Sequence, residues 1–195
     1  MRAARAFAGA VLVLALASAC SGSQPNLPEG GGTFADATCA DLARWAGATQ
    51  AAYRDLRATG QFDPSNPTAT QDQLSRLSTE LSNADQATAR LSDGISSRRA
   101  PDVANGEQVK KTILDSLKAL RDVAAKARAA IDGFDARAAT KEQSTAVRSS
   151  LDAITSSVTE TVAGLAPLLS SSPQLRAALE SSATCRQAGS QLFSS

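Results

Sequence analysis

The chain has 195 residues but no histidine, and it contains one tryptophan, one tyrosine and five phenylalanines. Without an imidazole, the chain cannot form a Ser-His-Asp hydrolase, a histidine general base or a histidine metal ligand. The sequence also lacks the G-x-S-x-G and S-x-x-K patterns in which other hydrolases activate a serine. We therefore expect no enzyme activity, no catalytic residue, no cofactor and no metal site.

An excess of charge of either sign is also missing. Lys and Arg together number 20 against 19 Asp and Glu, which gives a net charge of +1. A chain with this balance has no global attraction for nucleic acid, and it lacks the high net charge of disordered proteins. We expect a folded protein that does not bind nucleic acid.

The chain has one long apolar run, which lies close to its start. Two arginines in the first five residues precede a charge-free run over residues 6–16, and the small residues 17–19 lead to Cys20. This order is typical of a secretion signal, and the run is too short to span a bilayer stably. The sequence therefore predicts a signal peptide over residues 1–19 and an exported mature chain.

The segment Leu16-Ala17-Ser18-Ala19-Cys20 resembles the lipobox of bacterial lipoprotein precursors. In a lipobox the leucine usually lies three places before the cysteine, whereas Leu16 lies four places before Cys20. The resemblance implies that Cys20 becomes the first mature residue and carries a diacylglyceryl group, which anchors the protein on the extracytoplasmic face of the cell membrane. Because residues 17–19 also form an ordinary A-x-A cleavage site, a freely secreted protein is the alternative. The alanine-rich composition is similar to that of small lipoproteins of high-GC Gram-positive bacteria.

The remaining cysteines, Cys39 and Cys185, form an even pair once Cys20 is lipidated. Exported proteins fold in an oxidising compartment, where paired cysteines form disulfides. We predict a Cys39–Cys185 disulfide, with two buried free thiols as the alternative.

The mature chain divides into a tether and a helical domain. Residues 20–37 comprise the lipidated Cys20 and a Gly-, Ser- and Pro-rich stretch that is typical of a flexible linker. From residue 38 to 195, apolar residues recur at helical spacing between Gly-, Pro- and Asn-containing breaks. Helices are expected over residues 38–58, 70–97, 107–132, 140–166 and 173–186. The pattern predicts an all-α, up-and-down bundle of four to five helices, stapled by one disulfide.

Local signals mark two of the helix boundaries. Thr140-Lys141-Glu142-Gln143 has the form of a capping box, which predicts a helix start there. Pro167 is expected to end or kink that helix. Ser172 and Pro173 are typical of an N-cap and a first helical position, and they predict the start of the last helix.

Two groups of residues are candidate binding sites. Trp45 and Tyr53 are eight residues apart on one face of the first helix, where they could line a pocket for a small apolar ligand. The alternative is that both are large side chains of the core. The polar side of the third helix is basic and could face an envelope protein or polymer, or it is simply a solvated face. The basic residues of this candidate partner face are Lys110, Lys111, Lys118 and Arg121.

These patterns favour an exported, membrane-anchored, non-catalytic binding or interaction protein of the cell envelope, with a partner that the sequence leaves unidentified. The first alternative is a carrier or sensor of a small apolar molecule held between helices near Trp45 and Tyr53. A passive spacer without a binding role is a third interpretation. Apolar residues alternate at three- and four-residue spacing along the helices expected over residues 70–97 and 107–132, and these seams are compatible with packing within a monomer and with a homodimer.

Overall fold

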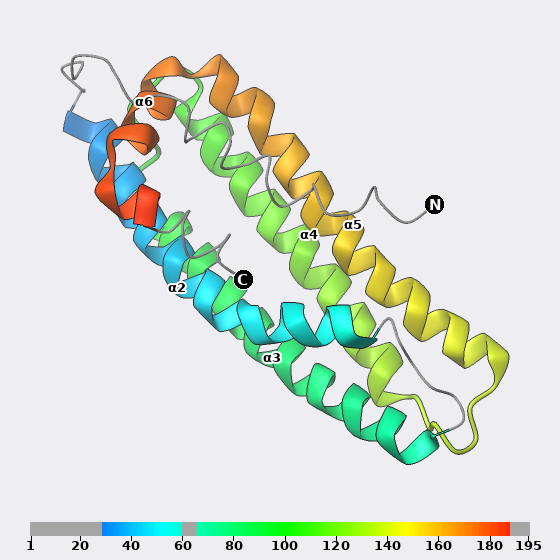
Figure 1. Cartoon of the computed structure of the whole chain (residues 1–195). Helices are drawn as coiled ribbons and strands as arrows, with labels where there is room; N and C mark the ends of the chain where they lie inside the picture. The colour runs from blue at the N-terminus through cyan, green and yellow to red at the C-terminus, as the bar shows by residue number, and fades with distance from the viewer. Residues whose placement is uncertain (1–28, 60–65, 188–195) are drawn as a thin grey trace, which may run out of the picture.

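The computed structural model describes residues 29–59 and 66–187, and within its helices it leaves out the side chains of residues 29–33, 53, 57–59, 158–159 and 161–171 (Figure 1). The described residues form helices and loops without a β-strand. The helices are α2 (Glu29–Thr59), α3 (Pro67–Ser97), α4 (Gly106–Asp132), α5 (Lys141–Ser171) and α6 (Pro173–Ser181). The predicted all-α class is confirmed.

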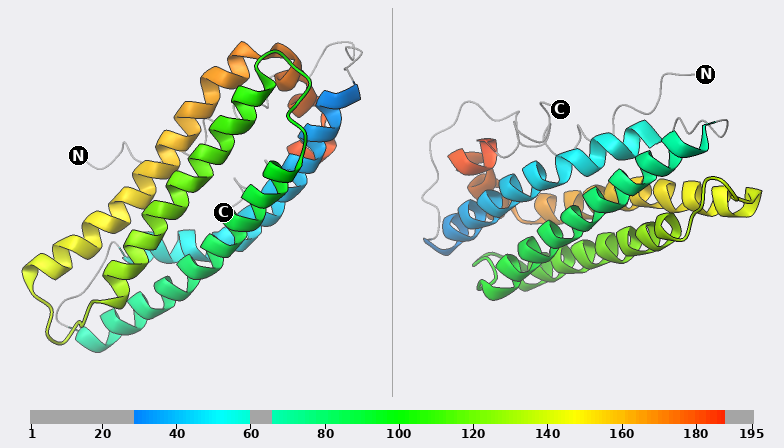
Figure 2. Two further views of the ribbon diagram at one scale, coloured as in Figure 1. Left: turned by 180° about the vertical axis from the view of Figure 1, so that it is seen from behind. Right: turned by 90° about the horizontal axis from the view of Figure 1, so that it is seen from below.

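Successive long helices run in opposite directions and pack side by side, α2 on α3, α3 on α4 and α4 on α5 (Figure 2). The short helix α6 contacts both α2 and α5 at one end of the bundle. We call this the disulfide end, and it also contains the start of α2, the α3–α4 loop and the start of α4. The opposite end, with the start of α3 and the α4–α5 loop, is the loop end. The 31 residues of α3 span about 46 Å, which is close to the length of the bundle.

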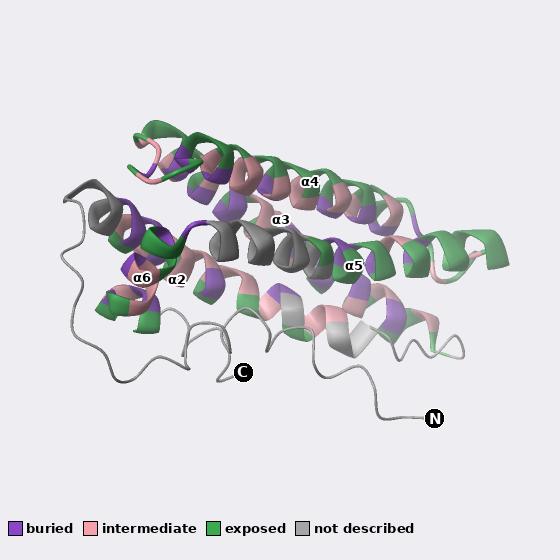
Figure 3. Ribbon diagram, turned by 90° about the horizontal axis from the view of Figure 1, so that it is seen from above, coloured by how far each residue is buried: buried purple, intermediate pink, exposed green. Residues whose placement is uncertain are grey.

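The apolar positions at three- and four-residue spacing form the core, as the sequence predicts. In Figure 3 the buried positions recur along the described parts of the helices. On α3 the buried members of the predicted seam are Leu74, Leu77, Leu81, Thr88, Leu91 and Ile95, and Ala84 is half-buried. A stripe with this period faces a neighbouring helix along its whole length, which is why α3 packs on both α2 and α4.

The core divides into clusters at the two ends. The loop-end core contains Leu74, Leu77, Leu81, Ala127, Ile131, Phe134, Val147, Leu151 and Ile154. The disulfide-end core contains Phe34, Leu91, Ile95, Val109, Leu117 and Leu175. A smaller cluster where α2 meets α6 contains Ala35, Cys39, Ala178 and Cys185.

Helix α2 begins nine residues before its predicted start. It starts at Glu29 rather than at residue 38, so residues 29–37, which were expected to belong to the tether, are helical. Phe34 and Ala35 are buried against α6 and the disulfide cluster. Local Gly-rich composition predicts a linker, but burial against a helix distant in sequence outweighs that preference.

The capping box at the start of α5 is confirmed. The Thr140 backbone N–H donates to Gln143 Oε1 at 2.9 Å, and the Gln143 backbone N–H donates to Thr140 Oγ1 at 3.2 Å. This reciprocal pair satisfies two backbone N–H groups at a helix start, where no carbonyl of the same helix can accept from them. Helix α5 therefore begins at the predicted place.

Helix α5 continues through Pro167 to Ser171, so the predicted end at Ala166 is wrong. A proline removes one backbone hydrogen bond, and a helix can bend locally and continue past it. Helix α6 then begins at Pro173 with Ser172 as N-cap, as predicted, although the Ser172 hydroxyl makes no capping hydrogen bond.

Candidate functional site

The disulfide predicted between Cys39 and Cys185 is present, with an S–S distance of 2.02 Å and a sequence separation of 146 between its cysteines. The two cysteines are 5% and 4% exposed and lie among Ala35 and Ala178. The Ser182 hydroxyl accepts a hydrogen bond from the Cys185 backbone N–H at 3.0 Å, which orients the helical turn that carries this cysteine. The bond therefore ties the first described helix to the C-terminal part of the chain.

An ion-paired group next to the disulfide end joins α2 to the end of α3. The Asp41 side chain is 11% exposed and pairs with the guanidinium groups of Arg98 and Arg44. Burial of the Asp41 carboxyl raises its pKa, but hydrogen bonds and charges from the two arginines outweigh that effect and hold the pKa below its ordinary value. Gly94 gives this carboxylate its space, because a Cβ there would lie 2.6 Å from Asp41 Oδ2.

The α3–α4 loop beside this group is tightly built. The backbone N–H groups of Val103 and Gly106 donate to the carbonyls of Pro101 and Val103 at 2.9 and 3.0 Å. Asn105 adopts the left-handed conformation, with φ of 64°, and precedes the first residue of α4. Lys110 Nζ donates to the Ser96 carbonyl at 2.8 Å and so satisfies a backbone acceptor at the end of α3.

Trp45, a candidate ligand-lining residue, is half-buried and packs against the disulfide-end core. Its indole N–H donates to Thr88 Oγ1 on α3 at 2.9 Å, and this hydroxyl donates to the Ala84 carbonyl at 2.7 Å. These contacts are those of a packing residue whose polar atom has a partner in the protein. Tyr53 lies in α2, but its side chain is outside the described residues, so the predicted pocket between the two aromatic side chains stays a prediction.

The four basic residues of α4 that form the candidate partner face all have partners within the protein. Lys111 pairs with Asp115 at 2.5 Å and Lys118 with Asp122 at 2.6 Å, both one helical turn apart. Arg121 reaches across to Asp85 of α3 at 2.8 Å, while Lys110 caps α3 as described above. Positive charge on this face is therefore largely balanced by neighbouring carboxylates.

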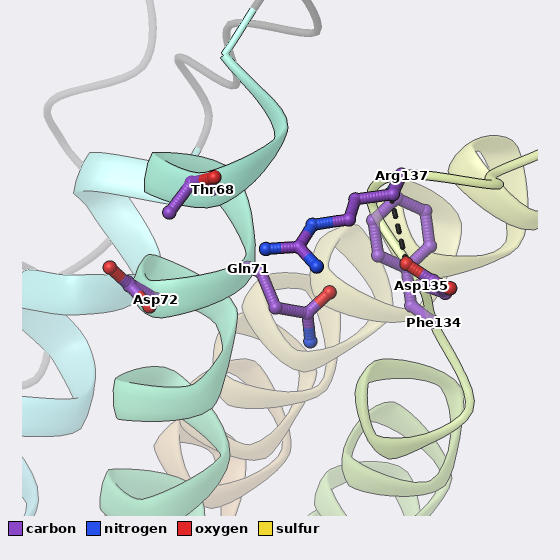
Figure 4. Close-up of a pocket in the computed structure, with 6 residues that line it drawn as sticks. All are labelled: Thr68, Gln71, Asp72, Phe134, Asp135 and Arg137. Atoms are coloured by element: carbon purple, nitrogen blue, oxygen red, sulfur yellow. Dashed lines mark hydrogen bonds between the residues drawn. The ribbon is translucent and has the colours of Figure 1, made fainter.

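A hollow at the loop end was not predicted from the sequence. It has a volume of about 320 Å³, and Thr68, Gln71, Asp72, Phe134, Asp135 and Arg137 line it (Figure 4). Figure 4 shows the Arg137 side chain reaching from the α4–α5 loop toward α3. Among the described residues no carboxylate pairs with this guanidinium. The sequence places these six residues on two segments about 65 positions apart, and no local motif joins them.

The loop that carries Arg137 is held in place by hydrogen bonds. Gln71 Oε1 of α3 accepts from the Ala136 backbone N–H at 3.0 Å, and Asp135 Oδ1 accepts from the Arg137 backbone N–H at 2.9 Å. Phe134 anchors the same loop in the loop-end core. The hollow therefore has a defined shape, with one cationic and two acidic side chains at its rim.

Cys20, the predicted lipidation residue, lies outside the described residues. Within residues 29–59 and 66–187, no helix is long and apolar enough to cross a membrane. The same part of the chain has no group of three or more His, Cys, Asp or Glu residues placed to hold a metal ion.

No protein-family model, no curated protein and no solved structure matches this chain.

Proposed function

We propose that this chain is an exported lipoprotein, anchored through a diacylglyceryl group on Cys20, that acts as a non-catalytic binding protein on the outer face of the cell membrane. The observation that carries the proposal is the buried Cys39–Cys185 disulfide. Stable disulfides form in exported proteins and are rare in the reducing cytosol. The signal-like start of the chain supports the same compartment, and its lipobox-like residues supply the anchor.

Intact-mass spectrometry of the mature protein, extracted from the membranes of its native host, tests this proposal. The expected mass starts at Cys20, includes an attached diacylglyceryl group and is two hydrogens below that of the reduced chain. A Cys20→Ser variant is the matched control, and it should carry no lipid and leave the membrane fraction. An unlipidated wild-type chain would contradict the anchor, and two free thiols would contradict the oxidising compartment.

The binding role is tested by crosslinking on intact cells. If the face of α4 contacts a partner, the variant Lys118→Glu with Arg121→Glu loses the crosslinked species, because both cationic groups are reversed. Lys126→Glu is the matched control, since Lys126 is exposed on the same helix and makes no ion pair among the described residues. A crosslink retained in the double variant would show that this face of α4 is not the binding surface.

The carrier alternative rests on the aromatic residues of α2. Trp45 is the only tryptophan of the chain, so its fluorescence reports directly on a ligand bound nearby. The hydrogen bond to Thr88 accounts for the indole N–H without a ligand. A saturable change in Trp45 emission on addition of an apolar ligand, lost in Thr88→Val, would favour the carrier over the interaction protein.

A further inference from the structure

The early start of α2 shortens the tether that would connect a lipidated Cys20 to the bundle. Only residues 21–28 separate Cys20 from Glu29, which makes nine Cα–Cα steps. Nine steps reach at most about 30 Å when fully extended. A random-coil linker of nine such steps has a root-mean-square reach of about 16 Å. Both distances are shorter than the length of α3, about 46 Å.

The tether joins the bundle at the disulfide end. Phe34, one and a half turns into α2, packs in the same cluster as Ile95 at the end of α3 and Val109 at the start of α4. The Cys39–Cys185 bond and α6 hold this part of α2 to the rest of the bundle. The attachment point is therefore fixed relative to the core, and only the eight tether residues separate it from the anchor.

The exposed surface of the α3–α4 loop is polar and carries one guanidinium and two carboxylates. Arg99, Asp102, Asn105 and Glu107 are exposed there, and Pro101 is buried. No large apolar side chain is exposed between residues 98 and 107 for insertion into hydrocarbon. Such a surface suits the hydrated headgroup layer, where polar groups keep their water.

The outer side of α4 has little unbalanced positive charge with which to bind a membrane along its length. Binding to an anionic leaflet depends on unbalanced Lys and Arg near its surface. On α4 the exposed lysines Lys111 and Lys118 are paired with Asp115 and Asp122 one turn away, which leaves Lys126 as the one exposed lysine of this helix without an ion pair among the described residues. The tether therefore decides which end is nearest to the bilayer.

We infer that the disulfide end, with its polar α3–α4 loop, is a surface that faces the lipid headgroups, and that the loop end points away from the membrane. This inference rests on the proposed lipid anchor at Cys20. It places the hollow lined by Phe134 and Arg137 on the side that an envelope partner reaches first.

Energy transfer to labelled lipids tests the orientation. The full lipidated chain is reconstituted in vesicles of phosphatidylethanolamine and phosphatidylglycerol that contain an acceptor-labelled lipid. A donor dye is attached to Ala104→Cys in the α3–α4 loop or to Ala138→Cys in the α4–α5 loop, both of which are exposed positions. Because the two loops are about 46 Å apart, transfer from position 104 should exceed that from position 138 at least about threefold. Equal transfer, or stronger transfer from position 138, would overturn the inference.

The intact mass of each labelled protein separates the two ways in which this experiment can fail. A chain without the acyl mass, made by a host that lipidates a control lipoprotein, contradicts the proposed anchor. Equal transfer in a chain that carries the acyl group contradicts the orientation alone. A matched variant with about twenty Gly and Ser residues inserted after Ser23 has a tether reach of about 30 Å, and it should reduce the transfer ratio. An unchanged ratio in this variant would contradict the role given to the tether.

Discussion

The loop-end core is built mainly from leucine, isoleucine, valine and phenylalanine, whereas the contact of α6 with α2 has few large side chains, chiefly Phe34 and Leu175, beside a cluster of two alanines and two cysteines. Burying a large aliphatic side chain stabilises a fold by about 1.5–3 kcal/mol, and alanine contributes much less. The loop end can therefore rely on packing, while α6 combines the packing of Leu175 with a covalent bond, and the Asp41 ion pairs join α2 to α3 nearby. The difference teaches that an alanine-rich chain can supplement a small core with specific cross-links where it has few large side chains.

The largest loss of stability is expected when the Cys39–Cys185 disulfide is removed. Replacing Cys39 and Cys185 by alanine should lower the free energy of unfolding by about 2–5 kcal/mol, because the unfolded chain regains the entropy of a 146-residue loop. Denaturant unfolding followed by circular dichroism measures the change. Reduced wild-type protein is the control and should behave like the double variant. A loss below about 1 kcal/mol would mean that packing alone holds α6.

The loop end should respond instead to loss of side-chain volume. Leu77 is fully buried in the loop-end core, so Leu77→Ala should cost about 2–5 kcal/mol through lost burial and the cavity left behind. Leu114→Ala, at a half-buried position near the disulfide end, is the control and should cost less. The same denaturant unfolding compares the two variants. Equal losses at the fully buried and the half-buried position would contradict the dependence of the loss on buried side-chain volume.

A smaller effect is expected from the Asp41 ion pairs, and it should depend on pH. The pKa of Asp41 is lower in the folded chain than in the unfolded chain, so its ionised form stabilises the fold at neutral pH. That contribution is lost as the pH falls through the folded pKa, below about 4. Asp41→Asn should therefore cost about 1–2 kcal/mol at pH 7, with a gap to wild type that narrows in acid.

Urea unfolding at a series of pH values measures this gap. Asp102→Asn is the matched control, because Asp102 is exposed in the neighbouring loop and forms no ion pair among the described residues. Its effect at pH 7 should stay within about 0.5 kcal/mol. A gap for Asp41→Asn that stays constant down to pH 2 would contradict the ionic origin of the effect.

The smallest and most local test compares two glycines. In a helix interior, glycine to alanine usually stabilises by about 0.5–1 kcal/mol, and Gly47→Ala should do so because, apart from its chain neighbours and the backbone of its own helix, no atom lies within 4 Å of the new Cβ. Gly94→Ala should instead be neutral or destabilising, because its Cβ displaces the Asp41 carboxylate from Arg98. Thermal unfolding of the two variants side by side gives the comparison. Equal stabilisation by the two substitutions would show that the Asp41–Arg98 ion pair shifts to make room for the new Cβ without a loss of stability.

The sequence predicts most of the fold because its signals are local or periodic. The three- and four-residue spacing of leucines identifies the seam of α3, and a four-residue capping box places the start of α5. The disulfide is predicted from the number of cysteines and from the oxidising compartment that the signal-like start of the chain indicates. The first two inferences use residues within one helix or at its start, and the disulfide is a pairing with few alternatives.

The features that the sequence does not predict depend on contacts between distant segments. Residues 29–37 contain three consecutive glycines, and only burial against α6 makes them part of a packed helix. Asp41 and Arg98 are separated by 57 residues, and nothing in either neighbourhood indicates the other. The hollow near Arg137 likewise needs the start of α3 and the α4–α5 loop to come together. The basic residues of α4 and the carboxylates four residues after Lys111 and Lys118 are visible in the sequence, but the pairing of Arg121 with Asp85 of α3 becomes evident only in the fold.

The position of the disulfide also decides how the protein transmits mechanical force. A pull between the N-terminal segment before Cys39 and the residues after Cys185 passes through the sulfur–sulfur bond. Helices α3, α4 and α5 lie in the covalent loop between these cysteines and are off that load path. Helix α6 and the turn after it lie beside the disulfide through which the force passes, and this bond holds them against α2. The bundle can therefore stay folded under a tension that would unravel an unlinked chain of the same helices.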